Sequence, residues 1–217
     1  MMINNLSHML KLCFVTNIRQ IKILEQAIHR GSITLVQLRE KTRDSSSVKP
    51  YALHIKSLLK PHKIPLIIND HVELAKEIDA DGVHIGQGDM HPDNAREILG
   101  PHKIIGLSIE TMEQLHIANK LKSINYVSAS AVFQSKTKTD IKLWGIDGLS
   151  EIVKNSYHPV TAIGGIKLHN LSEIMETGAH GVAVIGAITD SPDPVGASEE
   201  LRKIIDHYVV MGECYEI

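Results

Sequence analysis

Short apolar runs and longer helical patterns alternate along this chain. Eight runs are nearly continuous in hydrophobic residues, many of them β-branched, as expected for parallel strands that are buried on both faces. They are Leu12–Thr16, Ile33–Leu38, Leu66–Ile68, Gly82–Ile85, Ile104–Leu107, Tyr126–Ala129, Val160–Ile163 and Val182–Ile185. Between them, apolar residues recur at helical spacing, as at Ile21, Leu24, Ala27 and Ile28. This alternation predicts a parallel sheet with helices packed on it.

The regularity of the units favours a closed (β/α)8 barrel, the TIM barrel, over an open doubly wound sheet. A chain of 217 residues is long enough for one such barrel. We therefore predict a single barrel domain over residues 1–217, with short flexible extensions at about 1–10 and about 208–217. In such a barrel the residues that follow the carboxyl ends of the strands form the active site.

Composition narrows the function classes. Hydrophobic residues make up 43% of the chain and charged residues 22%, which is typical of a globular protein. A net charge of −2 without a Lys/Arg block indicates no nucleic-acid surface. No signal-peptide pattern or long apolar run predicts export or a membrane span. Cys13 is predicted to be a buried thiol, and its spacing from Cys214 indicates neither a disulfide framework nor a zinc site, so we expect a cytoplasmic protein.

Polar residues gather just after the predicted strands. Gln37, Arg39 and Lys41 alternate along the second strand, so they point the same way and could bind an oxygen-rich anion. The alternative is a solvated strand end. Asp70 and Asp89 follow the third and fourth strands and could share one Mg²⁺. Alternatively, Asp70 caps the next helix and Asp89 closes a glycine turn.

Three further features lie at the remaining strand ends. Ser108 follows the fifth strand and could either cap a helix or face a substrate. The longest irregular stretch, from about Gln134 to Gly148, carries Ser135, Thr137 and Lys138. The glycines after the seventh and eighth strands allow backbone N–H groups to approach a phosphate, as in many barrels. Tight turns would explain the same glycines. His84, inside an apolar run, is expected to be a hydrogen-bonded barrel residue.

Read together, the strand ends resemble the thiamine-phosphate synthase family over nearly the whole chain, from about Leu12 to Asp206. The segments that carry the resemblance are Thr34-Leu35-Val36-Gln37-Leu38-Arg39-Glu40-Lys41, Leu66-Ile67-Ile68-Asn69-Asp70, Asp81-Gly82-Val83-His84-Ile85-Gly86-Gln87-Gly88-Asp89-Met90, Ile105-Gly106-Leu107-Ser108 and Ala162-Ile163-Gly164-Gly165-Ile166. Such an enzyme joins a hydroxymethylpyrimidine diphosphate to a thiazole phosphate with Mg²⁺, and the resemblance suggests a homodimer.

The resemblance implies a role for each matched residue. The pyrimidine diphosphate would be bound by Gln37, Arg39, Lys41, Asn69, Ser108 and Lys138, of which Arg39, Ser108 and Lys138 would also act in catalysis. Asp70 and Asp89 would hold Mg²⁺ on the diphosphate. The thiazole phosphate would be bound by Ser135, Thr137, Gly165, Ile185 and Gly186.

The chain departs from the family pattern at two places. Ser130-Ala131-Val132-Phe133-Gln134-Ser135 stands where the family usually has Gly-Pro-Val-Phe-Pro-Thr, and Gly186 stands where serine is common. The related thiazole tautomerase branch is the first alternative, but it typically has a histidine at the position of Ala131 and lacks the two aspartates. A catalytically inactive paralogue that binds a phosphate ligand is the second.

Overall fold

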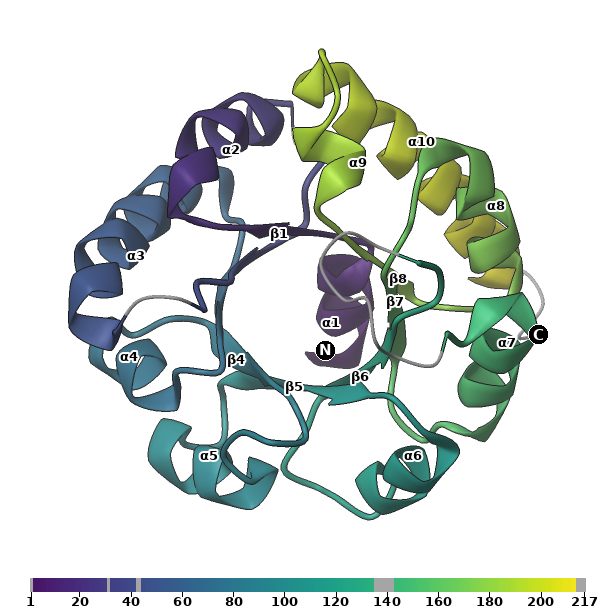
Figure 1. Ribbon diagram of the computed structural model, residues 1–217, viewed down its shortest axis with the longest axis horizontal. Helices are drawn as coiled ribbons and strands as arrows, with labels where there is room; N and C mark the ends of the chain where they lie inside the picture. The colour runs from purple at the N-terminus through teal and green to yellow at the C-terminus, as the bar shows by residue number, and fades with distance from the viewer. Residues whose placement is uncertain (1, 31, 42–43, 135–142, 214–217) are drawn as a thin grey trace.

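Eight parallel strands form a closed barrel in the computed structural model, which describes residues 2–30, 32–41, 44–134 and 143–213. The strands are β1 (Leu12–Thr16), β2 (Leu35–Leu38), β3 (Leu66–Asn69), β4 (Gly82–Ile85), β5 (Ile104–Ile109), β6 (Tyr126–Ser130), β7 (Val160–Ile163) and β8 (Gly181–Val184). Each strand pairs with the next, and β8 pairs with β1 (Figure 1). The predicted (β/α)8 barrel is confirmed, because this last pairing leaves no open sheet edge.

Helices surround the barrel on its outside, except for the first, which is seen through the ring of strands (Figure 1). In chain order they are α1 (Met2–Leu10), the 3₁₀ helix η1 (Ile18–Gln20), α2 (Ile21–Ile28), α3 (Ser45–Leu59), the 3₁₀ helix η2 (Lys60–His62), α4 (Val72–Glu77), α5 (Pro92–Leu99), α6 (Met112–Ala118), α7 (Gly145–Asn155), α8 (Leu168–Glu176), α9 (Gly186–Thr189) and α10 (Pro194–Glu213). The spacing found in the sequence sets how they pack: Leu24, Ala27 and Ile28 form the buried face of α2.

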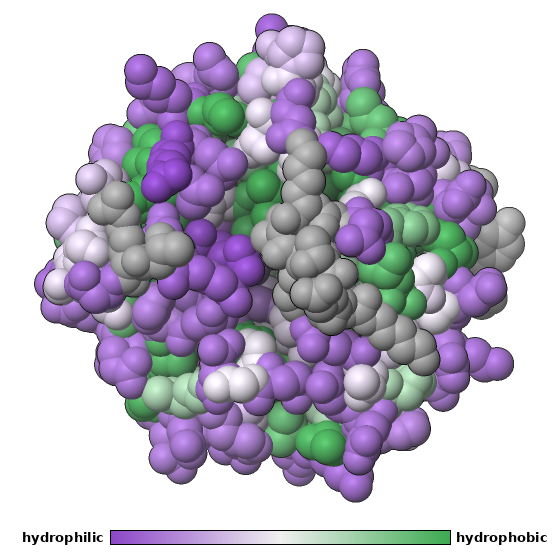
Figure 2. Space-filling view, in the orientation of Figure 1, coloured by the Kyte–Doolittle hydropathy of each residue, from purple (hydrophilic) through white to green (hydrophobic). Residues whose placement is uncertain are grey.

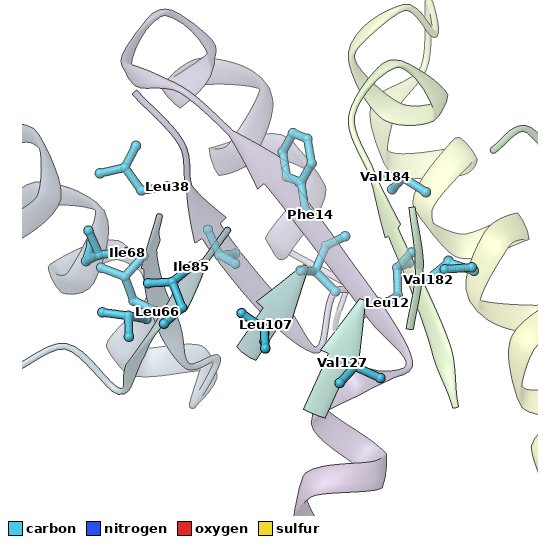
Figure 3. Packing of buried hydrophobic residues seen from close by; sticks show 14 of the residues in the cluster. Leu12, Phe14, Leu38, Leu66, Ile68, Ile85, Leu107, Val127, Val182 and Val184 are labelled. Atoms are coloured by element: carbon cyan, nitrogen blue, oxygen red, sulfur yellow. The ribbon is translucent and has the colours of Figure 1, made fainter. Parts of the chain in front are cut away.

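The strands separate two hydrophobic layers. Leu12 and Phe14 point outward into the large cluster between strands and helices, part of which Figure 3 shows. Cys13 and Val15, at the alternate positions, belong to the smaller cluster inside the barrel. The buried thiol predicted at Cys13 is confirmed, and burial raises its pKa to about 12, so it stays protonated at neutral pH.

The N-terminal segment, predicted as a short flexible extension at about 1–10, is helical. Residues 2–10 form α1, which is seen through the ring of strands in Figure 1. Leu6 and the fully buried Leu10 belong to the cluster inside the barrel, so α1 closes the end of the barrel at which the strands begin. At the other terminus, α10 continues to Glu213, beyond the predicted start of an extension near residue 208.

Several element boundaries also differ from the predicted ones. β2 begins at Leu35 rather than Ile33, and just before it the Thr34 hydroxyl accepts from Leu12 N at 2.8 Å. The irregular stretch expected to reach Gly148 ends earlier, since α7 begins at Gly145. Across the described ranges, no helix combines the length and apolar character needed to cross a membrane.

Candidate active site

Four neighbouring strands place polar side chains inside the barrel near their carboxyl ends. They are Gln37 on β2, Asn69 on β3, His84 on β4 and Ser108 on β5. Their chain neighbours Leu38, Ile68, Ile85 and Leu107 lie in the outer cluster (Figure 3), so the strand alternation turns the polar residues inward. Gln37 and Asn69 are only 4% and 7% exposed, so the barrel shields both side chains from most of the surrounding water.

A hydrogen-bonded chain fixes the position of Ser108. His84 Nδ1 is 2.9 Å from the Tyr126 hydroxyl, and His84 Nε2 is 2.9 Å from Ser108 Oγ. Gly106 makes room for the tyrosine, because a Cβ there would lie 2.2 Å from the Tyr126 ring. The expected barrel role of His84 is confirmed. The suggestion that Ser108 caps a helix is wrong, since Thr111 caps α6.

The carboxyl groups of Asp70 and Asp89 come together as expected from neighbouring strand ends. The pKa of Asp70 is raised to about 6 by burial first, and then by the hydrogen bond with Asp89 and repulsion from its charge. Asp70 has a φ of +64° and makes no cap, because His71 is the N-cap residue of α4 and has no capping side-chain bond. The turn suggested for Asp89 is present, with Oδ2 accepting from Gly86 N at 2.7 Å. One oxygen of Asp89 thus accepts the hydrogen bond that closes the turn, and the same carboxyl group also contacts Asp70.

Two cations lie beside this pair of aspartates. Lys41 Nζ is 4.0 Å from Asp70 Oδ2. Arg39 is half-buried, and burial lowers the pKa of its guanidinium while the charge of Asp70 opposes that shift. An anion that carries a divalent cation could therefore contact positive side chains and carboxylates at one place.

A cavity of about 510 Å³ lies between Arg39 and the loops that follow β7 and β8. Figure 2 shows hydrophilic residues around a hollow near the centre of this face. Gly165 has a φ of +66°, and a Cβ there would lie 2.6 Å from Gln134 O, so the turn after β7 requires glycine. Gly186 lines the cavity with ordinary φ, so the alternative of a strained turn does not apply to it.

The cavity contains polar residues that sequence reasoning did not single out. Lys167 and Asp190 form an ion pair at 3.8 Å beside Gly186. Gln20 and Thr189 also line the cavity. A lysine two residues after the paired glycines was a usable signal for Lys167, whereas only the folded α9 brings Asp190 to this place.

One protein family matches most of the sequence. The family model "Thiamine monophosphate synthase" matches residues 12–188. This chain belongs to the thiamine monophosphate synthase family. A thiamine-phosphate synthase of Vibrio campbellii is 46% identical over 83% of this chain and 88% of its own length. One of Chlamydia abortus is 40% identical over 90% of this chain and 95% of its own.

Solved structures agree. The thiamine phosphate pyrophosphorylase from Pyrococcus furiosus superposes with a TM-score of 0.86 at 34% identity, over 94% of this chain and 99% of that one. A 3-hexulose-6-phosphate synthase matches with a TM-score of 0.66 at 15% identity, over 89% of this chain and 99% of that one, which shows a shared fold alone. The resemblance to the thiamine monophosphate synthase family that the strand-end motifs predicted is confirmed.

The family's predicted site residues occupy two regions at the carboxyl ends of the strands. The structure brings Arg39, Lys41, Asp70 and Asp89 together at β2–β4. It places Gly165, Ile185 and Gly186 on the cavity at β7–β8. Ser135, Thr137 and Lys138 lie outside the described residues. Binding roles of all of these residues stay predictions.

The ends of the segment that carries those three residues are held together. Trp144 N donates to Ala131 O at 3.0 Å, and Gly145 N donates to Val132 O at 3.0 Å. Phe133 N donates to Gly164 O, also at 3.0 Å. The substituted stretch Ser130–Gln134 is therefore attached both to the turn after β7 and to the start of α7.

Proposed function

We propose that this chain condenses 4-amino-2-methyl-5-hydroxymethylpyrimidine diphosphate with 4-methyl-5-(2-hydroxyethyl)thiazole phosphate, giving thiamine phosphate and diphosphate. One observation carries the proposal: a chain of this family has a cluster of charged side chains and a glycine-lined cavity at the same end of one barrel. The Asp70–Asp89 pair with Arg39 and Lys41 suits the diphosphate, and the glycine-lined cavity suits the thiazole phosphate.

The carboxylate pair suits a resident Mg²⁺. Among the described residues no three His, Cys, Asp or Glu side chains gather around a metal position. Mg²⁺ does not need such a cluster, because it uses one or two carboxylates together with waters and substrate phosphates. Burial raises the pKa of Asp70 most, and its hydrogen bond with Asp89 and repulsion between the two carboxyl groups add to the shift. Asp70 and Asp89 would hold the ion, which when bound neutralises charge on the diphosphate.

The side chains of this chain would stabilise the departing diphosphate. Cleavage of the bond between the pyrimidine methylene carbon and the diphosphate oxygen leaves negative charge on the diphosphate and positive charge on the pyrimidine. Arg39 and Lys41 are positioned beside Asp70 to bind the growing negative charge, a type of stabilisation that is usually a large part of catalysis. Lys138 is proposed to join them. Ser108, oriented by His84, would bind the same substrate.

The second substrate would be positioned rather than activated. Its phosphate would bind at Gly165, Ile185 and Gly186, with Ser135 and Thr137 proposed to add hydroxyl groups. The thiazole nitrogen then attacks the pyrimidine methylene carbon, so the reaction needs no protein nucleophile. Holding both reactants in line supplies much of the acceleration of such a reaction.

A coupling assay with both purified substrates, with and without Mg²⁺, tests the proposal. Formation of thiamine phosphate and diphosphate is the expected result. Isomerisation of a thiazole carboxylate phosphate without coupling would indicate the tautomerase alternative. Binding of phosphate ligands without any product would indicate the inactive paralogue. Ala131 argues against the tautomerase, because a methyl group on the cavity wall cannot transfer a proton.

Two expectations from the resemblance are independent of the chemistry. A homodimer is proposed, and light scattering after size-exclusion chromatography measures its mass. The expected cytoplasmic location also stays a prediction.

A further inference from the structure

Lys167 places a positive charge on the wall of the cavity. None of the binding roles proposed above involves this residue. It lies between the glycine turn after β7 and the start of α8, and its side chain is 42% exposed. Its Nζ is 3.8 Å from Asp190 Oδ2, and both groups lie beside Gly186. Both residues line the same cavity as Gly165 and Gly186.

The backbone around Lys167 is held by one side chain. Asn170 Oδ1 accepts from Lys167 N at 2.8 Å, and Asn170 Nδ2 donates to Gly165 O at 3.1 Å. The glycine turn and the lysine are therefore fixed relative to each other. A ligand that binds the backbone of the turn would therefore lie close to the point from which the lysine side chain extends.

The ion pair between Lys167 and Asp190 lies directly beside Gly186. A Cβ at residue 186 would lie 3.0 Å from Asp190 Oδ2 and 3.3 Å from Lys167 Nζ. The ammonium and carboxylate groups thus occupy the space into which a side chain at residue 186 would extend. Residue 186 has no side chain in this protein, and the ammonium group of Lys167 lies next to it.

Charge makes this cation significant for a phosphate ligand. Of the described residues that line the cavity, only Arg39 and Lys167 carry a positive charge at neutral pH. Arg39 lies beside Asp70, in the proposed diphosphate region. Lys167 Nζ would lie 3.3 Å from a Cβ at residue 186, so a phosphate beside Gly186 would meet this cation.

We infer that Lys167 is the specificity-determining residue that recognises the phosphate group of the thiazole substrate, replacing a side-chain donor at residue 186. The inference rests on the proposed function. The ammonium group has three donors, so it can bind phosphate oxygens while it keeps Asp190 as a partner. Asp190 orients the ammonium group but also repels the dianion, which limits the affinity.

The first test varies the thiazole phosphate at saturating pyrimidine diphosphate in the coupling assay. Lys167→Met keeps most of the side-chain length and removes the charge. A hydrogen bond to a charged group is strong enough that KM for the thiazole phosphate should rise roughly tenfold to a hundredfold. KM for the pyrimidine diphosphate should not change, and kcat should change less than threefold. Lys154→Met, at an exposed site in the last turn of α7, is the matched control and should change neither constant.

A binding measurement separates charge recognition from general damage. Calorimetric titrations in the presence of Mg²⁺ and inorganic diphosphate would compare the thiazole phosphate with the corresponding alcohol. Lys167→Met should weaken binding of the phosphate and leave binding of the alcohol unchanged. No thiamine phosphate from the unaltered protein would overturn the proposed function. Normal product formation with an unchanged KM in Lys167→Met would overturn only the role of Lys167.

Two more variants test the coupling to Gly186 and Asp190. Gly186→Ser in the Lys167→Met background should recover part of the lost affinity, because the space beside residue 186 is then free of the ammonium group. Gly186→Ser alone should bring no gain, since Lys167 and Asp190 crowd the new side chain. Asp190→Asn should lower KM for the thiazole phosphate. If Asp190→Asn instead raised KM as much as Lys167→Met, the pair would be structural and the inference would be wrong.

Discussion

At the scale of single residues, the Asp70–Asp89 pair is the most informative feature. Two carboxyl groups in contact are unfavourable unless a proton or a cation lies between them. Burial raises the pKa of Asp70 most, and the hydrogen bond with Asp89 and the repulsion from its charge raise it further. The arrangement costs stability in the free protein and provides a site at which a divalent cation relieves the repulsion.

Replacing either aspartate should damage turnover. We expect Asp70→Asn and Asp89→Asn each to lower kcat at least about tenfold at limiting Mg²⁺, because each removes charge from the proposed ion site. In the Asp89→Asn variant the amide oxygen can still accept from Gly86 N, so the turn should remain. Asp93→Asn, at an exposed position in the first turn of α5, is the control. Unchanged turnover in both site variants would refute a shared metal.

The same pair predicts a pH dependence. A carboxyl whose pKa is raised from 3.8 to about 6 binds more protons in the folded than in the unfolded protein between those values. The free energy of unfolding of the metal-free protein should therefore fall as pH rises through this window. Mg²⁺ competes with the proton, so it should raise Tm more at about pH 7.5 than at about pH 5. Thermal unfolding with and without Mg²⁺ measures the difference, and Asp70→Asn should remove it.

At the scale of elements, the loops after the strands carry the constraints. The turn after β7 is defined by positive φ and by its close approach to the Ser130–Gln134 stretch. Those contacts connect the phosphate region to the segment in which Ser135, Thr137 and Lys138 lie. A change in one loop is therefore expected to affect the other.

Gly165→Ala should destabilise the protein. The added Cβ conflicts with both the φ of +66° and Gln134 O, so we expect a loss of about 1–3 kcal/mol in the free energy of unfolding. Gly88→Ala is the control, because φ there is ordinary and a Cβ would meet no atom within 4 Å. Urea unfolding of both variants tests the prediction, which fails if they are equally stable.

The loop residues should separate the two substrates. Lys138→Ala is expected to lower kcat more than it weakens thiazole-phosphate binding, because charge on the diphosphate grows only in the transition state. Ser135→Ala should raise KM for the thiazole phosphate with a smaller effect on kcat. Steady-state kinetics with each substrate varied in turn measures both. A change confined to the thiazole-phosphate KM in Lys138→Ala would move this lysine to the other anion.

At the scale of the whole molecule, the two ends of the barrel have different tasks. The carboxyl ends of the strands carry the polar residues, and α1 closes the opposite end with Leu6 and Leu10. This division is common in barrels of this type, in which stability and chemistry are kept apart.

Leu10→Ala tests the division. Removing a fully buried leucine should lower the free energy of unfolding by about 2–5 kcal/mol. The kcat of the folded protein should stay within about twofold of the original, because the site lies at the other end of the barrel. Leu53→Ala, at a side chain that is 45% exposed, is the control for stability. A large loss of kcat in the folded Leu10→Ala protein would show that the two ends are coupled.

The barrel and the candidate residues at its strand ends could be predicted from the chain alone. A strand that is buried on both faces is mostly apolar, so β1–β8 formed a recognisable pattern. The polar residues Gln37, Arg39, Asn69 and Asp70 stood out at the ends of these apolar runs. The side chains of a strand alternate with a fixed period, which is why inward and outward positions could be assigned before the fold was known.

The contacts between distant segments became visible only in the folded barrel. Tyr126, His84 and Ser108 form one chain because three strands are paired in register, and Lys167 meets Asp190 because β7 and β8 are neighbours. The sequence of α1 does not indicate that this helix closes the barrel. Its apolar face packs against the end of the barrel, and not only against the segment that follows it in the chain. The pattern of apolar and polar residues along the chain indicates which residues are buried and which face solvent. Contacts between distant segments depend on the closure of the sheet, and no single stretch of sequence specifies that closure.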